Sequence, residues 1–424
     1  MLNPRSFRED LGVLRDAMAR RGKLDLYGPQ IDEGESLDKS RRAAIQRVEE
    51  KKAERNRVSQ EVGKRKKAGE DASELQAAAR TLGDEIAALE AELATTQARL
   101  DELLLGIPNL PLPDVPAGDE TANRVLRSWG EPRAAESVKP HWDVGETLGL
   151  FDLPRGAKIS GSGFIVYRGK GARLVRTLMN LMLDLHTGTF GYDETWVPVV
   201  VNRATMTGTG QLPKFEDDMY ALKDEDMFLI PTAEVPVTNL FRDEILSAEE
   251  LPKALCAYSP CFRREAGSAG KDTRGLLRVH EFDKVELVRY CAPEDGEAQF
   301  ELLLSHAEAV LQKLGLPYRV LLLAAGDTGF SSAKTYDLEV FAPGVGKWLE
   351  VSSCSIFTDF QARRANIRYR PAAGEKPRFV YTLNASGLAF PRIIAALLEH
   401  YQQADGSVLL PEPLHAGLGT DRLG

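Results

Sequence analysis

A short stretch of the chain combines cationic, aromatic and acidic side chains in a spacing that could bind a nucleotide. Phe262-Arg263-Arg264-Glu265 is followed by AGSAGKDTRG, which is rich in small and charged residues, and then by LLRVHEFDKVELVRY. Two β-like pieces around such a loop predict a hairpin with a long basic loop. Alternate residues of an extended return strand share one face. Here they are Arg278, His280, Phe282, Lys284 and Glu286.

This face suits a ligand better than it suits a hydrophobic core. An aromatic ring among cations can stack on a base while the cations hold phosphates. An exposed strand face with surface ion pairs explains the same residues, and the strand alone does not decide between the two. Glu234 and Glu286, taken singly, also fit ordinary surface ion pairs.

The segments around this hairpin predict an α+β fold. The β-rich stretches are 164–167, 195–201, 227–231, 276–290, 336–341, 348–352 and 379–381, and the helical ones are 171–188, 295–314 and 386–403. Strands come in a block between helices, so we expect an antiparallel sheet with helices packed on it. The sequence contains no GxxxxGK[ST] loop and no Rossmann glycine pattern.

The N-terminal part of the chain predicts an antiparallel helical hairpin. From Leu75 to Leu103 apolar positions recur in alternating steps of four and three residues, a heptad seam broken only by Thr96. Residues 38–68 favour helix, and between Lys39 and Lys67 twelve Lys or Arg stand against four Glu, a net charge of +8. The basic segment KRKKAG would form the turn. A spacer or dimerisation coiled coil with a solvated charged face is the competing interpretation.

A proline-rich stretch separates this hairpin from the rest of the chain. GIPNLPLPDVPAG, residues 106–118, contains four prolines in thirteen residues. Proline breaks helices and stiffens loops. We therefore expect an N-terminal domain at 1–105, a linker at 106–118 and a larger domain at 119–424.

Composition limits the class of protein. Hydrophobic residues make up 43% and charged residues 28%, as in globular chains. No run of 18 apolar residues occurs and the N-terminus is charged, so we expect a cytoplasmic protein without a membrane partner. Four cysteines fit buried thiols better than disulfides or a zinc site. A net charge of −9 argues against a uniformly basic nucleic-acid binder but permits a local basic surface.

Three motifs resemble those of the class II aminoacyl-tRNA synthetases, in the form typical of the seryl-tRNA synthetase family. FRREAGSAGKDTRGLLRVHEFDKVE resembles motif 2, and GYDETWVPVVVN, with Pro198, resembles motif 1. LNASGLAFPRIIAALLEHYQ resembles motif 3, a strand and helix with Arg392 as its invariant arginine. TGTGQLPKF, PTAEVPVTN and EVSSCSIFTDFQARRANIRYR extend the resemblance over essentially the whole chain. Many members have glycine where Ala385 and Pro391 stand, and proline is tolerated in a first helical turn.

The resemblance implies an enzyme that activates L-serine with ATP and transfers it from seryl-adenylate to tRNA(Ser). It leaves open whether a selenocysteine tRNA is also charged. Both first substrates carry negative charge, so catalysis would consist mainly of positioning and charge neutralisation. The residues implied for catalysis are Arg263, Glu350 and Arg392. Those implied for serine are Thr232, Ala233, Glu234, Arg263, Glu286, Asn384 and Ser386. Those implied for ATP are Arg263, Arg264, Glu265, Val279, Phe282, Glu350, Val351, Ser352, Ser353 and Arg392, with Lys271, Arg274 and Arg278 for its outer phosphates.

The same resemblance implies the metal and the partners. Glu350 and Ser353 would hold Mg²⁺, since oxygen ligands suit a hard cation. The protein would be a homodimer with Pro198 in the interface, and its helical arm would contact tRNA through phosphates and shape. DNA is not expected as a partner.

Two rival functions are a paralogue that loads a carrier protein and a degenerate, non-catalytic binding protein. The long arm argues against the first, and the presence of Arg263, Glu286, Glu350 and Arg392 argues against the second.

Overall fold

The computed structural model describes residues 1–266 and 274–424 and divides into two compact units. One unit comprises residues 2–19 and 23–108, and the other comprises Met1, residues 20–22 and residues 109–424. Among the described residues, no helix combines the length and apolar character needed to cross a membrane. The two units are treated separately below.

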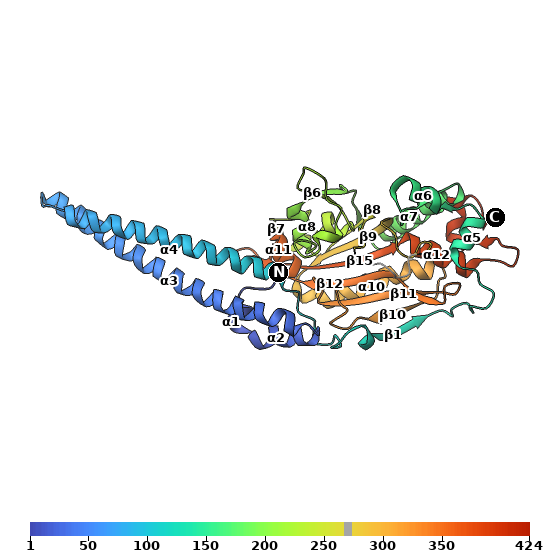
Figure 1. Cartoon of the computed structure of the whole chain (residues 1–424), viewed down its shortest axis with the longest axis horizontal. Coiled ribbons are helices and arrows are strands. Elements are labelled where there is room, and N and C mark those ends of the chain that lie inside the picture. The colour runs from blue at the N-terminus through green and yellow to red at the C-terminus, as the bar shows by residue number, and fades with distance from the viewer. Residues whose placement is uncertain (267–273) are drawn as a thin grey trace. The chain divides into compact units, whose positions relative to one another are not determined.

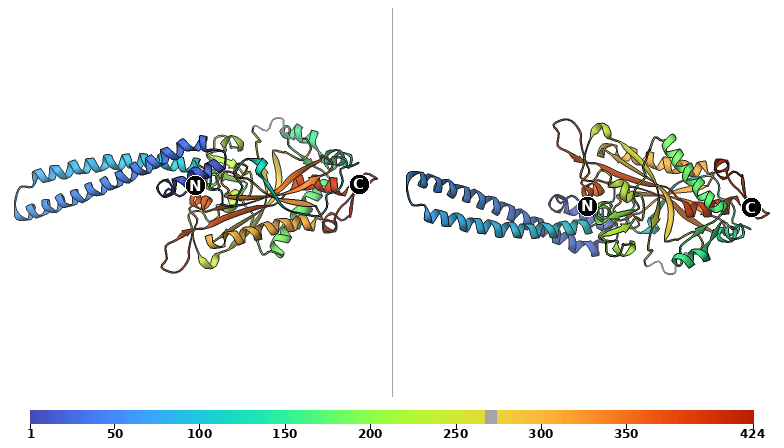
Figure 2. Two further views of the ribbon diagram at one scale, coloured as in Figure 1. Left: turned by 90° about the horizontal axis from the view of Figure 1, so that it is seen from below. Right: turned by 90° about the horizontal axis from the view of Figure 1, so that it is seen from above.

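The N-terminal unit is a long antiparallel helical hairpin (Figure 2). It consists of α3 (Leu24–Ala68) and α4 (Ser73–Gly106), preceded by α1 (Ser6–Glu9) and α2 (Leu11–Arg20). α3 ends because Gly69 adopts a φ of 76°, a conformation that glycine reaches without strain. The heptad seam predicted on α4 is confirmed, since Leu82, Ile86, Leu89, Leu100 and Leu103 are buried. α3 begins at Leu24, well before the predicted start near residue 38.

An eight-stranded sheet forms the centre of the larger unit (Figure 1). Its order is β1-β10-β11-β12-β15-β9-β8-β4, and all neighbouring strands are antiparallel except β4 and β8. The predicted α+β class with an antiparallel sheet is confirmed. The strands are β1 (Arg124–Trp129), β4 (Asp193–Glu194), β8 (Lys253–Phe262), β9 (Glu281–Cys291), β10 (Tyr318–Leu322), β11 (Lys334–Ala342), β12 (Lys347–Thr358) and β15 (Tyr381–Ala389).

Three helices pack with the sheet around one hydrophobic core. α7 (Lys170–Gly188), α10 (Gly296–Lys313) and α12 (Phe390–Tyr401) contribute apolar side chains to the same buried cluster as β9, β11, β12 and β15. The smaller elements are η1 (Glu120–Ala122), α5 (His141–Thr147), β2 (Phe151–Asp152), α6 (Leu153–Ser160), β3 (Val166–Tyr167), β5 (Val200–Asn202), α8 (Arg203–Thr209), η2 (Glu216–Asp218), β6 (Met227–Leu229), α9 (Glu234–Thr238), β7 (Ile245–Ser247), η3 (Ala248–Glu250), η4 (Pro293–Asp295), α11 (Phe360–Ala365), β13 (Arg368–Arg370), β14 (Arg378–Phe379), β16 (Val408–Leu409), η5 (Glu412–Leu414), α13 (His415–Leu418) and β17 (Arg422–Leu423).

The return strand of the predicted hairpin starts later than expected. β9 begins at Glu281, so Arg278 and His280 precede the strand, and their assignment to its face was wrong. The His280 carbonyl still accepts from the Arg263 N–H at 2.9 Å, but its own N–H donates to the Gly163 carbonyl at 2.9 Å, a partner outside the hairpin. Phe282, Lys284 and Glu286 remain alternate residues of the strand.

Motif 3 is the second place where the elements differ from the sequence prediction. The helix predicted at 386–403 begins only at Phe390, because residues 381–389 form β15. This strand has a hydrogen-bonded neighbour on each side, β12 and β9. Pairing along two edges outweighs a local helical pattern, and the change places Asn384 and Ser386 on the sheet.

The buried imidazole of His186 generates a prediction about acid stability. Burial lowers the pKa of His186 to about 3, with a smaller contribution from His306. The unfolded chain, whose histidine has a pKa of about 6.5, therefore takes up a proton that the folded protein does not. The contribution of His186 to the free energy of unfolding is complete above about pH 6.5. It decreases as the pH falls below about 6.5, by ~2 kcal/mol at pH 5. Urea unfolding of the wild type and His186→Leu at pH 7.5 and pH 5 measures this loss, and equal losses in both proteins would contradict it.

Candidate functional site

Two adjoining cavities lie on the sheet where β8, β9, β15 and β12 run side by side. Arg263, Lys284, Glu350 and Ser386 line both of them. Molecules bound in the two cavities could therefore both contact these four side chains.

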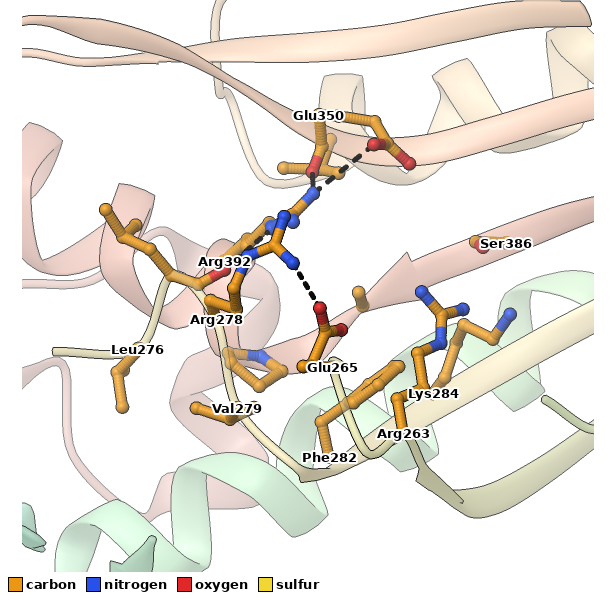
Figure 3. Close-up of a pocket in the computed structure, with 14 residues that line it drawn as sticks. Arg263, Glu265, Leu276, Arg278, Val279, Phe282, Lys284, Glu350, Ser386 and Arg392 are labelled. Carbon is orange, nitrogen blue, oxygen red and sulfur yellow. Dashed lines mark hydrogen bonds and ion pairs between the residues drawn. The ribbon is translucent and has the colours of Figure 1, made fainter. Parts of the chain in front are cut away.

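The first cavity has an aromatic floor and cationic walls (Figure 3). The Arg263 guanidinium carbon lies 5.1 Å from the centroid of the Phe282 ring. Arg278 forms an ion pair with Glu265. Arg392 comes from α12, and its Nη1 donates to the Glu350 carbonyl oxygen at 2.6 Å. The arrangement can hold a flat ring and several anionic groups at once.

The second cavity is lined by two buried carboxylates and their partners. Glu234, at the start of α9, accepts a hydrogen bond from Gln361 Nε2 at 2.7 Å. Glu286 on β9 accepts one from Asn384 Nδ2 at 3.1 Å and forms an ion pair with Lys284. Both glutamates are almost inaccessible to solvent, at 8% and 1% exposure, so these partners replace water.

Burial and like charge change the ionisation of these two glutamates. Burial, and next the Glu286 charge, raise the pKa of Glu234 to about 7. Burial also raises the pKa of Glu286, while Lys284 opposes the rise. Arg263 lowers both pKa values, so the two cations that face this cavity favour the ionised carboxylates.

Glu350 and Ser353 on β12 have the oxygen donors that a hard cation prefers, and Asp337 on β11 lies opposite Ser353. Burial and the Glu350 charge raise the pKa of Asp337 well above its ordinary value. Its Oδ1 is buried and accepts no hydrogen bond from the described part of the chain. Within that part, no three His, Cys, Asp or Glu side chains group in a metal-binding arrangement. The oxygen donors of Glu350, Ser353 and Asp337 are of the kind that suits a hard cation such as Mg²⁺.

Most residues predicted for the site line one of the cavities. The first contains Arg263, Glu265, Val279, Phe282, Glu350, Val351, Ser386 and Arg392. The second contains Thr232, Glu234, Arg263, Glu286, Glu350, Ser353, Asn384 and Ser386.

Three predicted residues lie beside the cavities without lining them. Ala233 belongs to a hydrophobic cluster, Arg264 is exposed and donates to the Asp217 carbonyl, and the Ser352 hydroxyl lies 2.6 Å from the Ser386 carbonyl oxygen. Among the residues proposed for outer phosphates, Arg278 lines the first cavity, Arg274 packs over Trp142, and Lys271 lies outside the described residues.

Lys284 and Gln361 received no role from the sequence, although both contact site residues. Alternation along β9 did place Lys284 beside Phe282 and Glu286, which was a usable signal. Gln361 lies on α11, and nothing in its local sequence points to Glu234.

Comparisons with known proteins cover the whole chain. Residues 1–111 match the seryl-tRNA synthetase N-terminal domain, and residues 214–401 match the tRNA synthetase class II core domain (G, H, P, S and T). A serine–tRNA ligase of Gemmatimonas aurantiaca is 68% identical, over 98% of each chain. The chain belongs to the seryl-tRNA synthetase family. All lining residues of the first cavity fall within the class II core match.

Solved members of the seryl-tRNA synthetase family have the same fold. The crystal structure of seryl-tRNA synthetase from Pyrococcus horikoshii complexed with ATP has a TM-score of 0.95 and 38% identity, covering 100% of this chain and 99% of that one. The cytoplasmic serine–tRNA ligase of Naegleria fowleri in complex with AMP has a TM-score of 0.89 and 28% identity, covering 100% and 98%.

The electrostatics of the second cavity predict a protonation event near neutral pH. Glu234, with a pKa of about 7, takes up a proton as the pH falls through that value. An infrared difference spectrum between pH 8.5 and pH 5.5 should show a protonated carboxyl band that Glu234→Gln loses. Glu250→Gln is the matched control, because backbone and lysine contacts lower the pKa of Glu250 and keep it ionised. A band of wild-type intensity in Glu234→Gln would contradict the assignment.

Proposed function

We propose that the first cavity binds ATP and the second binds serine, and that the two substrates meet at Arg263. The protein is a ligase that charges tRNA with serine, as its family membership implies. The observation that carries the assignment of the cavities is that Arg263 lines both of them. In adenylation the serine carboxylate attacks the α-phosphate, pyrophosphate leaves, and seryl-adenylate remains bound. A tRNA terminal hydroxyl then attacks the serine carbonyl and releases AMP.

Arg263 bridges the α-phosphate and the serine carboxylate in this proposal. Both groups are anionic, and a planar guanidinium can donate to each of them with separate N–H groups. Phe282 stacks on one face of the adenine, and Arg392 covers its other face near the γ-phosphate. Glu265 and the Val279 backbone contact the edge of the adenine. Catalysis is then positioning and charge neutralisation, without a covalent enzyme intermediate.

The second cavity recognises the amino acid through its two carboxylates. Glu234 pairs with the serine ammonium, and Glu286 accepts the serine hydroxyl, with Thr232, Asn384 and Ser386 around them. Alanine lacks the hydroxyl and would leave the buried Glu286 carboxylate without that partner, which disfavours alanine strongly. This pairing supports serine over amino acids without a side-chain donor.

Glu350 and Ser353 are the proposed Mg²⁺ ligands. When bound, Mg²⁺ would neutralise charge on the α- and β-phosphates. Asp337 supports the assignment, because it lies opposite Ser353 and its buried Oδ1 accepts no hydrogen bond within the described residues.

A homodimer is proposed through the segment 191–202. Trp196 follows the edge strand β4, is 74% exposed, and lies 5.7 Å from the Tyr258 ring. A large exposed aromatic at a sheet edge is typical of interfaces. A cytoplasmic location and the domain limits 1–105, 106–118 and 119–424 are retained as part of the proposal.

The helical hairpin is the proposed tRNA-binding arm. Some of its cations form ion pairs between α3 and α4: Lys51 lies 2.8 Å from Glu85, and Lys52 lies 2.7 Å from Glu90. At the tip, Lys64 is 77% exposed, 3.8 Å from Glu61, and Lys66 and Lys67 are exposed as well. Because these cations at the tip are exposed, they can contact RNA phosphates, which supports RNA binding over a spacer role.

Replacing Arg263 by lysine tests the meeting point of the two substrates. Arg263→Lys should lower serine-dependent ATP–pyrophosphate exchange by about 100-fold or more, because a single ammonium cannot replace a fork of donors. Circular dichroism should remain that of the wild type. Arg203→Lys, whose arginine pairs with Glu216 and Asp226 at the surface, is the control and should retain exchange. Near-normal exchange by Arg263→Lys would remove Arg263 from the mechanism.

Neutralising the tip of the hairpin tests the role of the arm. Changing Lys64, Arg65, Lys66 and Lys67 to glutamine should weaken tRNA binding and flatten its salt dependence by about one unit of slope per lost phosphate contact. Pyrophosphate exchange should not change. Lys51→Gln/Lys52→Gln is the control, because those cations already pair with glutamates, and it should alter the slope less. Unchanged tRNA charging by the tip variant would favour the spacer interpretation.

A further inference from the structure

Lys284 places a buried ammonium group between the two cavities. It lies on β9, its side chain is 6% exposed, and it lines both cavities. Its Nζ donates to Thr232 Oγ1 at 2.8 Å and forms an ion pair with Glu286. A lysine costs free energy to bury unless its charge is paired, so these contacts account for its position.

The Thr232 hydroxyl is oriented by this lysine. Its oxygen accepts from Lys284 Nζ and from the Glu234 N–H at 3.2 Å, which uses both acceptor positions of a hydroxyl. The hydroxyl hydrogen is then left to donate, and the Thr232 side chain contributes to lowering the pKa of Glu286. Lys284 thus contacts both Thr232 and Glu286.

The Glu286 carboxylate is held on both sides. Oε1 accepts from Asn384 Nδ2 at 3.1 Å, and Lys284 lies against Oε2. A carboxylate held in this way has a fixed plane and lone pairs in fixed directions. It can present an acceptor only to a donor that approaches from the cavity.

The charges around the pair show why a cation is needed beside Glu286. The groups that face Glu286 and Lys284 are Glu234 on α9, Arg263 after β8, and the buried thiols of Cys261 on β8 and Cys354 on β12. Arg263 lies at the meeting point of the two substrates, where their anionic groups would engage it. Lys284 is then the cation that stays with the two buried glutamates.

We propose that Lys284 is a positioning residue for serine selection, which holds Glu286 ionised and oriented as the acceptor of the serine hydroxyl. The proposal rests on the assignment of the second cavity to serine. Lys284 acts through Glu286 and Thr232 and need not touch the substrate itself. It therefore affects serine more than ATP, although it lines both cavities.

The test is pyrophosphate exchange by Lys284→Met, Glu286→Gln and the double variant. Lys284→Met should raise the KM for serine by about 10-fold or more and change the KM for ATP by less than about twofold, the pattern of a lost polar contact to one substrate. In the Glu286→Gln background the same change should cost less than about threefold, because the carboxylate that Lys284 acts on is absent. Lys284→Gln, which keeps a donor for Thr232 without the charge, replaces Lys284→Met if that variant does not fold.

A pH profile separates positioning from packing. Without the ammonium, Glu286 should protonate at higher pH, so the acid limb of kcat/KM for serine should move upward and activity should partly recover at pH 9. Equal loss for serine and ATP, an unmoved acid limb and additive effects in the double variant would overturn the proposal for Lys284. If Glu286→Gln itself left serine activation unchanged, the assignment of the cavity to serine would fail instead.

Discussion

Two buried carboxylates, Glu234 and Glu286, face the same cavity and repel each other, so the site can hold both only with cations beside them. Lys284 and Arg263 supply the positive charge, and Gln361 and Asn384 supply hydrogen bonds in place of water. A buried charge without such partners would cost several kcal/mol. The arrangement of strands and helices around the cavity is the means by which these groups are brought within reach of one another.

The antiparallel pairing of β12, β15, β9 and β8 brings most of these groups together. Ser386 lies opposite Glu286 in the β15–β9 register, and Ser355 lies opposite Asn384 in the β12–β15 register. A sheet fixes such pairs to within a fraction of an ångström of their neighbours, which catalysis by positioning requires. Arg392 arrives from α12 and reaches Glu350 on β12, so motif 3 joins the helix to the sheet at the proposed phosphate end of the site.

The hairpin follows a different physical rule. Its stability comes from a narrow apolar seam, and its charges lie at the surface, where ion pairs are weak and screened by salt. Cations in such a place are suited to many reversible phosphate contacts, whereas Lys284 in the larger unit is buried and held by its partners. The net charge of −9 does not reveal this difference between the two units, because a sum over the chain does not report where the charges lie.

Features that depend on near neighbours in the chain could be read from the sequence. The heptad seam, the glycine that ends α3, the alternation of Phe282, Lys284 and Glu286, and the α+β class are of this kind. The site residues could be named only through motif resemblance, and their roles remain predictions. Only the tertiary structure decided that Lys284 contacts Thr232 across 52 residues and that Gln361 contacts Glu234 across 127. These depend on pairing and burial through space, and no local periodicity encodes a contact between segments so far apart in the chain.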